Sequence, residues 1–208
     1  MLVRVQAAIP ISKEGKEVYC VEPSPSMMQE IKKKRDEDPD LYSSLILIED
    51  NAKEFDIDDD FSLIVMSGVF DHFLADENQI CTLLNFNKHL VKGGTLVFDV
   101  GFGYMEEEDE YNLADTVEKD GKEYRRYIKR EKKDGSTLFV NLKYETYEDG
   151  ELIDTIEQRS KVGIIDKDKI HKLLNETGFE IKNEFGDYDR KTYEGRDLVC
   201  VVEAIKKE

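Results

Sequence analysis

Short, nearly continuous apolar runs recur along the first half of the chain, at residues 17–22, 45–48, 61–66 and 95–100. Each is too short for a helix of ordinary length and has no alternation of polar residues. Strands show this pattern when helices cover both faces of a parallel sheet. The pattern therefore predicts parallel strands buried on both sides.

Helical patterns separate these runs. Ser24-Pro25 predicts a helix N-cap followed by proline at the first helical position, and this helix must end before Pro39. A second helix is expected to begin at Asp76 and to close at Gly93-Gly94. Strands alternating with helices in this order predict an α/β fold, a Rossmann-like doubly wound and mostly parallel sheet.

The middle of the chain follows a different period. Asp120-Gly121, Asp134-Gly135 and Asp149-Gly150 are hairpin turn signals, and between the last two the apolar residues alternate from Leu138 to Tyr144. An antiparallel β meander over roughly Lys122–Ile165 is expected, inserted into the α/β sheet. One face of it should pack and the other should meet water.

The α/β pattern resumes at Asp166, which is expected to cap a helix that Gly178 terminates. Closing strands are predicted at 179–185 and 198–205. The expected organisation is a cofactor-binding core at 1–111, an inserted antiparallel subdomain at 112–165 acting as a substrate lid, and a return to the core at 166–208.

Composition narrows the class of partner. The formal net charge is −17 over 208 residues, which argues against binding a nucleic-acid backbone. No apolar run reaches the ~20 residues that a membrane span needs. The three cysteines are far apart in sequence, so we expect them to be reduced and the protein to be cytoplasmic.

Polar residues at the predicted strand ends are the candidate chemistry. Ligands of open α/β sheets bind outside the carboxyl ends of the strands. Glu22 ends one strand, where a carboxylate can accept hydrogen bonds from both hydroxyls of a ribose. Asp50-Asn51-Ala52 ends the next, where an acceptor can meet an adenine amino group, and Ser67–His72 follows the third. Together these ends predict a nucleoside-type cofactor site.

These segments resemble the class I S-adenosylmethionine-dependent methyltransferases of the small-molecule type. The resemblance rests on Val18–Met27, Asp50–Ala52, Phe61–His72 and the Leu90-Val91-Lys92-Gly93-Gly94 turn before a strand. It implies S-adenosylmethionine as cofactor and a small molecule as methyl acceptor. The inserted meander is also similar to the substrate lid of such enzymes.

The resemblance implies roles for individual residues. His72 is the expected base that deprotonates the acceptor, and Tyr104 is expected to line the acceptor pocket. No metal site is expected, because His and Cys are few and scattered. The residues expected to bind the cofactor are Glu22, Ser24, Met27, Asp50, Asn51, Ala52, Ser67 and Gly68.

The N-terminal segment departs from the family pattern. The family begins with a strand and a glycine-rich loop, whereas Met1–Gln6 contains no glycine. The first strand is expected to be missing altogether. A truncated or misannotated start, a shortened strand within Met1–Val5, or a strand supplied by a neighbouring subunit would each explain this departure. The last of these makes a homo-oligomer one of the expected states.

Three hypotheses about function follow. The chain is an active methyltransferase on a small acceptor, or a non-catalytic module of the same fold that binds or oligomerises. The third hypothesis is a nicotinamide-binding Rossmann protein, which also places an acid after its second strand. The predicted antiparallel ending and the Gly-Gly turn argue against the third.

Overall fold

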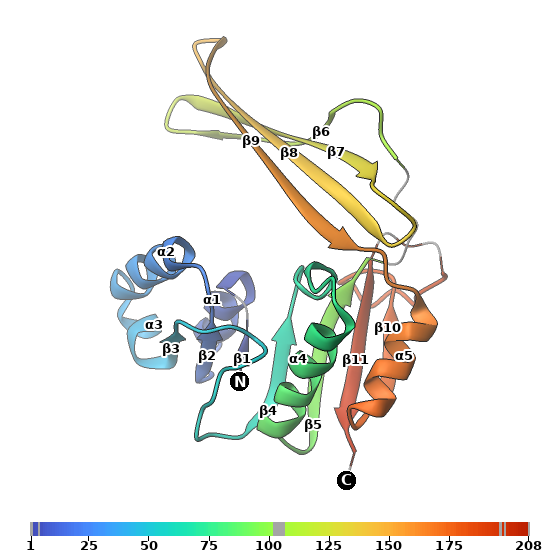
Figure 1. Cartoon of the computed structure of the whole chain (residues 1–208). Helices are drawn as coiled ribbons and strands as arrows, with labels where there is room; N and C mark the ends of the chain where they lie inside the picture. Colours follow the sequence, from blue (N-terminus) through green and yellow to red (C-terminus); the bar gives the residue numbers. More distant parts are fainter. Residues whose placement is uncertain (1, 4, 102–106, 196, 198, 208) are drawn as a thin grey trace.

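A computed structural model describes residues 2–3, 5–101, 107–195, 197 and 199–207. They form a seven-stranded sheet of order β10-β11-β5-β4-β1-β2-β3 and a separate four-stranded sheet of order β6-β7-β8-β9 (Figure 1). The strands of the larger sheet are β1 (Leu2–Val3), β2 (Val18–Val21), β3 (Leu45–Ile48), β4 (Phe61–Met66), β5 (Leu90–Val100), β10 (Phe179–Phe185) and β11 (Cys200–Lys206). The helices are α1 (Val5–Lys13), α2 (Pro25–Asp36), α3 (Pro39–Ser44), α4 (Asp76–His89), α5 (Lys167–Glu176) and the short 3₁₀ helix η1 (Phe70–His72).

The predicted Rossmann-like fold with an antiparallel meander is confirmed. Strands β1 to β5 pair in parallel, and β11 runs antiparallel between β5 and β10. The helices divide over both faces of the sheet. In β2, Val18 and Cys20 belong to a core cluster with Ala8 of α1, whereas Tyr19 and Val21 pack against a larger cluster on the opposite side.

The expectation that the first strand is missing is wrong. Leu2 and Val3 form a parallel strand between β2 and β4, with Leu2 paired to both Tyr19 and Ile64. This is the shortened-strand explanation for the departure. A strand of two residues is too short to produce any hydrophobic period, so only the pairing partners on either side reveal it. The gap that a neighbouring subunit was expected to fill is therefore occupied.

The helix predicted to close at Gly93-Gly94 ends earlier. It begins at Asp76, with Ala75 rather than Asp76 at the N-cap, and it ends at His89. The glycines lie within β5, where the pairing register with β4 shifts between Phe61 and Leu63. Gly93 has φ +71°, and a Cβ on Gly94 would lie 2.8 Å from the carbonyl oxygen of Val91. The two glycines therefore permit this irregular start of β5.

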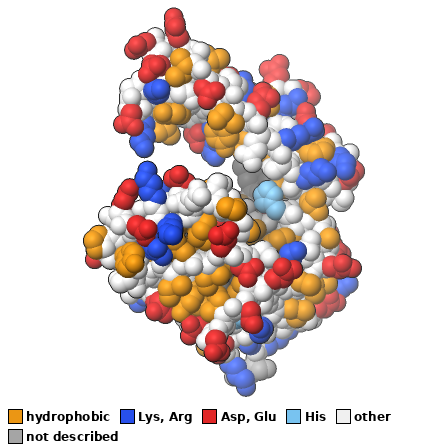
Figure 2. Space-filling model, turned by 60° about the vertical axis from the view of Figure 1, so that its left-hand side comes forward, with side chains coloured by type: hydrophobic (Ala, Val, Ile, Leu, Met, Phe, Trp, Pro, Cys, Tyr) orange, Lys and Arg blue, Asp and Glu red, His pale blue; other side chains and the backbone are white. Residues whose placement is uncertain are grey.

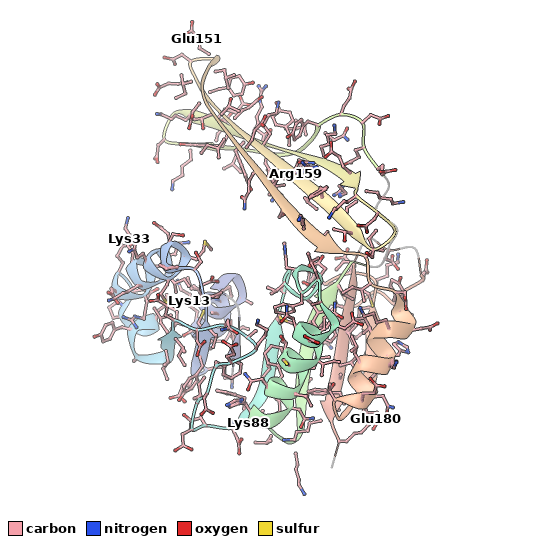
Figure 3. All side chains as sticks on the ribbon, in the orientation of Figure 1. Lys13, Lys33, Lys88, Glu151, Arg159 and Glu180 are labelled. Atoms are coloured by element: carbon pink, nitrogen blue, oxygen red, sulfur yellow. The ribbon has the colours of Figure 1, made fainter. Side chains whose placement is uncertain are left out.

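The meander consists of β6 (Asn112–Lys119), β7 (Lys122–Lys132), β8 (Thr137–Glu148) and β9 (Glu151–Gly163). The meander was expected to begin at about Lys122, and it begins one strand earlier, with β6. Its turns are where they were expected, and Glu151 lies at the far tip of the β8–β9 hairpin (Figure 3). The alternating face packs only at its base, because Leu138 is 2% exposed whereas Tyr144 is 37% exposed.

The end of the chain follows the prediction closely. The Asp166 side chain accepts a hydrogen bond from the Lys169 amide, as an N-cap does. Of the cysteines, Cys20 and Cys200 are buried and Cys81 is exposed; all three are free. Within the described ranges, none of the helices has the length and apolar character needed to cross a bilayer.

Candidate cofactor and active site

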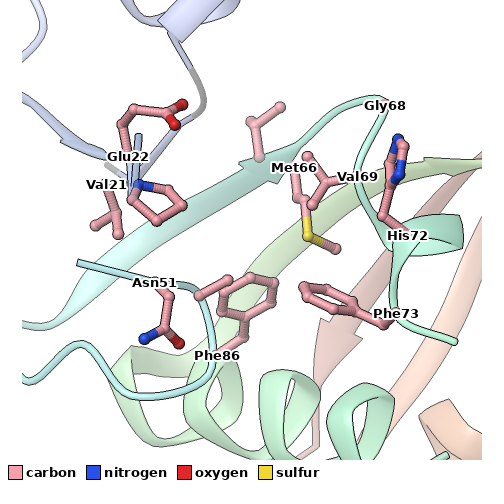
Figure 4. A pocket seen from close by; sticks show the side chains of 12 residues that line it. Val21, Glu22, Asn51, Met66, Gly68, Val69, His72, Phe73 and Phe86 are labelled. Carbon is pink, nitrogen blue, oxygen red and sulfur yellow. The ribbon is translucent and has the colours of Figure 1, made fainter. Parts of the chain in front are cut away.

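A cavity of about 350 Å³ lies at the carboxyl ends of β2, β3 and β4 (Figure 4). Glu22 and Asn51 lie on one side of it and His72 on the other. The wall between them is mostly apolar, a typical composition for a small-molecule site. The complete lining is Val21, Glu22, Pro23, Asn51, Ala52, Val65, Met66, Gly68, Val69, His72, Phe73 and Phe86.

The side of the cavity near β2 is built on Glu22. Its backbone amide bonds to the Ile48 carbonyl at 3.1 Å, which continues the pairing of β2 with β3. Its side chain is buried, and Oε1 accepts the Ser24 amide at 2.9 Å. Ser24 in turn caps α2 by accepting the Met27 amide. The Glu22 carboxylate is thus held at the cavity with hydrogen-bonding capacity left for a ligand hydroxyl.

The side near β3 is a compact turn. Asp50 Oδ1 accepts the Asn51 amide at 2.7 Å, and Asn51 Oδ1 accepts the Lys53 amide at 3.0 Å. Asn85 of α4 donates to the Ala52 carbonyl at 3.3 Å. These bonds place Asn51 and Ala52 on the cavity and turn Asp50 to a supporting position. Ala52 and Phe86 both contribute apolar surface to the cavity lining.

The third side follows β4. Gly68 has φ +62°, a left-handed conformation that favours glycine, and the chain then enters η1. His72 is exposed and lines the cavity from the end of η1. The Gln79 side chain donates to the Phe73 carbonyl at 2.7 Å and fixes the end of this segment.

The structure brings together five of the predicted residues on this cavity: Glu22, Asn51, Ala52, Gly68 and His72. Ser24, Met27, Asp50 and Ser67 lie beside it and are not part of its lining. Met27 is 40% exposed on α2. Tyr104 lies outside the described residues.

Sequence reasoning missed the apolar lining from Met66, Val69, Phe73 and Phe86, and it missed Asp99 behind the cavity. Asp99 is a single acid inside the otherwise apolar end of β5, and it is only 5% exposed. A lone acid within an otherwise apolar predicted strand is the sequence signal that could have drawn attention to it.

The two other histidines have structural partners. His89 is buried, and its Nδ1 lies 2.9 Å from the Asn85 carbonyl. His171 Nε2 lies 2.8 Å from Glu184 Oε1. Among the described residues, no group of three or more His, Cys, Asp or Glu side chains could hold a metal ion.

Beyond the cavity, Figure 2 shows a hollow between the four-stranded sheet above and the larger sheet below, with a histidine side chain on its wall. The base of the four-stranded sheet adjoins η1, since a Cβ on Gly163 at the end of β9 would lie 3.4 Å from the Asp71 carbonyl oxygen.

Comparison with known proteins identifies the type of domain. Residues 5–96 match a family described as "Methyltransferase domain". This part of the chain is thus similar to a methyltransferase domain. No curated protein matches the sequence.

Solved structures extend the likeness over the whole chain. The chain is similar to the CcbJ methyltransferase from Streptomyces caelestis, with 18% identity and a TM-score of 0.80, covering 100% of this chain and 82% of that one. SAM-bound CalS10 from Micromonospora echinaspora, an amino pentose methyltransferase, has 13% identity and a TM-score of 0.77 with 99% and 83% coverage. The sugar N-methyltransferase KedS8 from Streptoalloteichus sp ATCC 53650 has 15% identity and a TM-score of 0.77 with 100% and 79% coverage. The chain has the fold of these methyltransferases, and the resemblance predicted from the strand ends is confirmed.

Proposed function

We propose that this chain transfers a methyl group from S-adenosylmethionine to a small-molecule acceptor. One observation carries the proposal: Glu22, Asn51 and His72, from three separate strand ends, line a single cavity. That cavity is close in volume to small-molecule sites in general, about 300–1,000 Å³. Its mixture of one buried carboxylate, an amide and apolar walls suits a nucleoside with a charged tail.

The ribose and the adenine of S-adenosylmethionine each have a matching group in the cavity lining. The Glu22 carboxylate would accept hydrogen bonds from ribose hydroxyls, and Asn51 would offer amide groups to the adenine edge. Ala52 and Phe86 supply apolar surface for the purine ring. When bound, S-adenosylmethionine supplies a methyl group on a sulfonium sulfur, which is already a strong electrophile.

The chain's own contribution to the reaction is mainly placement. Holding an acceptor in line with the methyl group and away from water accounts for most of the acceleration such a reaction needs. His72 lies at the edge of the cavity, on the side opposite Glu22 (Figure 4). A ring nitrogen of His72 would first accept a proton from the acceptor atom and so free its lone pair. That lone pair would bond to the methyl carbon while the carbon–sulfur bond breaks and its electrons return to sulfur, which leaves S-adenosylhomocysteine.

We further propose an amine nitrogen as the acceptor atom, on a sugar or a similarly polar small molecule. CalS10 and KedS8 act on an amino pentose and on a sugar nitrogen, respectively, and both share the fold of this chain throughout its length. A net charge of −17 favours the approach of a cationic amine over that of an anion. Residues 1–111 and 166–208 would then bind the cofactor, and residues 112–165 would cover the acceptor.

The test is calorimetric titration of the 208-residue chain with S-adenosylhomocysteine, followed by methyl transfer to a panel of amino sugars, alcohols and catechols. Micromolar binding with transfer to amino sugars supports the full proposal. Binding with transfer only to oxygen acceptors refutes the amine assignment alone. Absence of binding refutes the cofactor assignment.

The second candidate is a non-catalytic module of the same fold. The observation that favours it is the glycine-free start of the chain: α1 begins at Val5, two positions after β1 ends, where the family has a glycine-rich loop. This candidate predicts no affinity for S-adenosylhomocysteine, so the same titration separates the two.

Self-association, one of the sequence-based expectations, now rests on a different feature. Val117, Tyr124, Tyr144 and Ile156 come from the four strands β6 to β9, share one face by register, and are 37–57% exposed. Figure 2 shows hydrophobic side chains on the surface of this sheet. We propose that a second copy of the chain covers this face, because several large apolar side chains exposed on one face of a sheet are typical of an interface.

A further inference from the structure

Asp99 is a buried carboxylate that does not touch the cavity yet bonds to the segment that shapes it. It lies one residue before the end of β5 and is 5% exposed. Its Oδ1 accepts the Gly68 amide, and its Oδ2 accepts the Ser67 and Tyr188 hydroxyls, each at 2.5 Å. Removing a carboxylate from water is unfavourable unless such donors compensate it. The three donors compensate the Asp99 carboxylate for its burial.

The donors come from two separate parts of the chain. Ser67 and Gly68 begin the segment Ser67–Phe73, whose residues Gly68, Val69, His72 and Phe73 all line the cavity. Gln79 holds the other end of the segment through the Phe73 carbonyl. Because Gly68 is in the left-handed conformation, the direction in which the chain leaves β4 depends on how its amide is held. The Asp99 carboxylate is an acceptor for that amide.

Tyr188 brings the second part, the connection between β10 and β11. This connection folds back on itself, since the Gly186 amide bonds to the Lys191 carbonyl at 2.7 Å and Lys191 Nζ lies 3.0 Å from Asp197. Tyr188 is 65% exposed as a whole, yet its hydroxyl reaches the buried carboxylate. Burial of that hydroxyl, together with the bond to Asp99, raises the pKa of Tyr188, so the group stays a donor at neutral pH.

We propose that Asp99 is a positioning residue of the methyltransferase site: its carboxylate fixes the Ser67–Phe73 segment on the cavity and, through Tyr188, ties the β10–β11 connection to the same point. This inference rests on the proposed function, because it concerns the cavity assigned to the cofactor. It assigns Asp99 no contact with the cofactor or the acceptor. Geometry, rather than negative charge, is what the site requires of it.

Substitution of Asp99 separates geometry from charge. The side-chain amide introduced by Asp99→Asn would keep an oxygen for the Gly68 amide, and its NH₂ group would donate to the Ser67 and Tyr188 hydroxyls, which can also accept. Asp99→Asn is therefore expected to bind S-adenosylhomocysteine within about threefold of the wild type. Asp99→Ala removes all three bonds and is expected to weaken binding about tenfold or more. In an active preparation it should also lower kcat about 10²-fold, since small displacements of a site reduce turnover steeply.

The measurement is calorimetric titration with S-adenosylhomocysteine, run beside NMR hydrogen exchange of the Gly68 amide. Gly68 exchange should accelerate in Asp99→Ala and not in Asp99→Asn. Tyr188→Phe should accelerate exchange in residues 187–195 while leaving S-adenosylhomocysteine affinity within about threefold. Tyr42→Phe removes a hydroxyl from an exposed ring on α3 and serves as the matched control, with both readouts unchanged.

The proposal is overturned if Asp99→Ala binds S-adenosylhomocysteine as the wild type does, or if Asp99→Asn loses as much affinity as Asp99→Ala. If Asp99→Ala does not fold, the double variant Ser67→Ala/Tyr188→Phe replaces it; this variant removes two of the three bonds and keeps the Gly68 bond, so a loss of affinity of about threefold to tenfold is expected. Failure of the wild type itself to bind refutes the proposed function instead. Gly68 exchange still reports in that case whether Asp99 holds the turn, and an unchanged Gly68 rate in Asp99→Ala would overturn the positioning role.

Discussion

Replacing Glu22 tests the assigned role of the cavity most directly. Glu22 follows β2, is 8% exposed, and keeps its carboxylate in place through the Ser24 amide at 2.9 Å from Oε1. Glu22→Ala removes every acceptor at this position. Glu22→Gln keeps one oxygen for the Ser24 amide and replaces the other with a donor, so the shape of the site is preserved without its charge.

The magnitude follows from the hydrogen bonds at stake. Two ribose hydroxyls donating to an ionised carboxylate contribute about 1.5–3 kcal/mol each. The lower value gives about 3 kcal/mol for the pair, which corresponds to roughly a hundredfold loss of affinity in Glu22→Ala. Glu22→Gln retains one acceptor and loses the charge, so we expect about a tenfold loss.

The assay is calorimetric titration of wild type and both variants with S-adenosylhomocysteine at one salt concentration. Glu49→Gln is the matched control, because Glu49 follows the neighbouring strand β3, is exposed and does not line the cavity. Thermal melts without ligand show whether each variant is folded. Wild-type affinity in a folded Glu22→Ala would refute the reasoning, since no role in ribose binding could then remain for this carboxylate.

Three further predictions concern stability and assembly. Leu83→Ala should lower the free energy of unfolding by about 2–5 kcal/mol, whereas Leu84→Ala should change it by less than about 0.5 kcal/mol. The reason is that Leu83 is 0% exposed and Leu84 is 50% exposed. Similar urea midpoints for the two variants would contradict the packing of α4. Burial alone would raise the pKa of Glu184, but His171 and Lys167 lower it below the ordinary 4.5. A carboxyl group whose pKa is lower in the folded state stabilises the fold at pH values above its unfolded-state pKa. This contribution is lost as the pH falls through the folded-state pKa. Urea melts should therefore show Glu184→Gln less stable than wild type at about pH 7, with the difference shrinking below about pH 4.5; a constant difference would exclude this linkage. In light scattering, Ile156→Lys should reduce the molar mass to that of one chain, and Leu152→Lys, on the opposite face by register, should not; a wild type that is already monomeric would end this proposal.

The local pattern was sufficient wherever a segment's own composition decides its structure. The strands at 45–48, 61–66 and 179–185 have the predicted bounds, and the caps at Ser24 and Asp166 form as expected. Hairpin turns at Asp120-Gly121 and Asp149-Gly150 have positive φ at both residues, which this pairing of residue types favours. In each case the preference lies within a few neighbouring residues.

Features that depend on distant partners could not be predicted. The two-residue β1 exists because β2 and β4 leave a place between them. The irregular start of β5, mistaken for the end of a helix, depends on its register against β4. The short helix α3 was also missed; Asp38 caps it and Pro39 is its first residue, so the proline that was used only to end α2 also begins the next helix.

The sequence by itself determined the fold class and three strand-end segments that belong to one site, because strand length, caps and turn residues are local properties. Only the tertiary structure decided which side chain at each end meets the cavity. It placed Asn51 on the lining and Asp50 behind it. It also joined Tyr188 to Asp99, 89 residues apart in sequence. Such contacts depend on the order and register of the strands, and these are fixed by packing over the whole sheet rather than by any one segment.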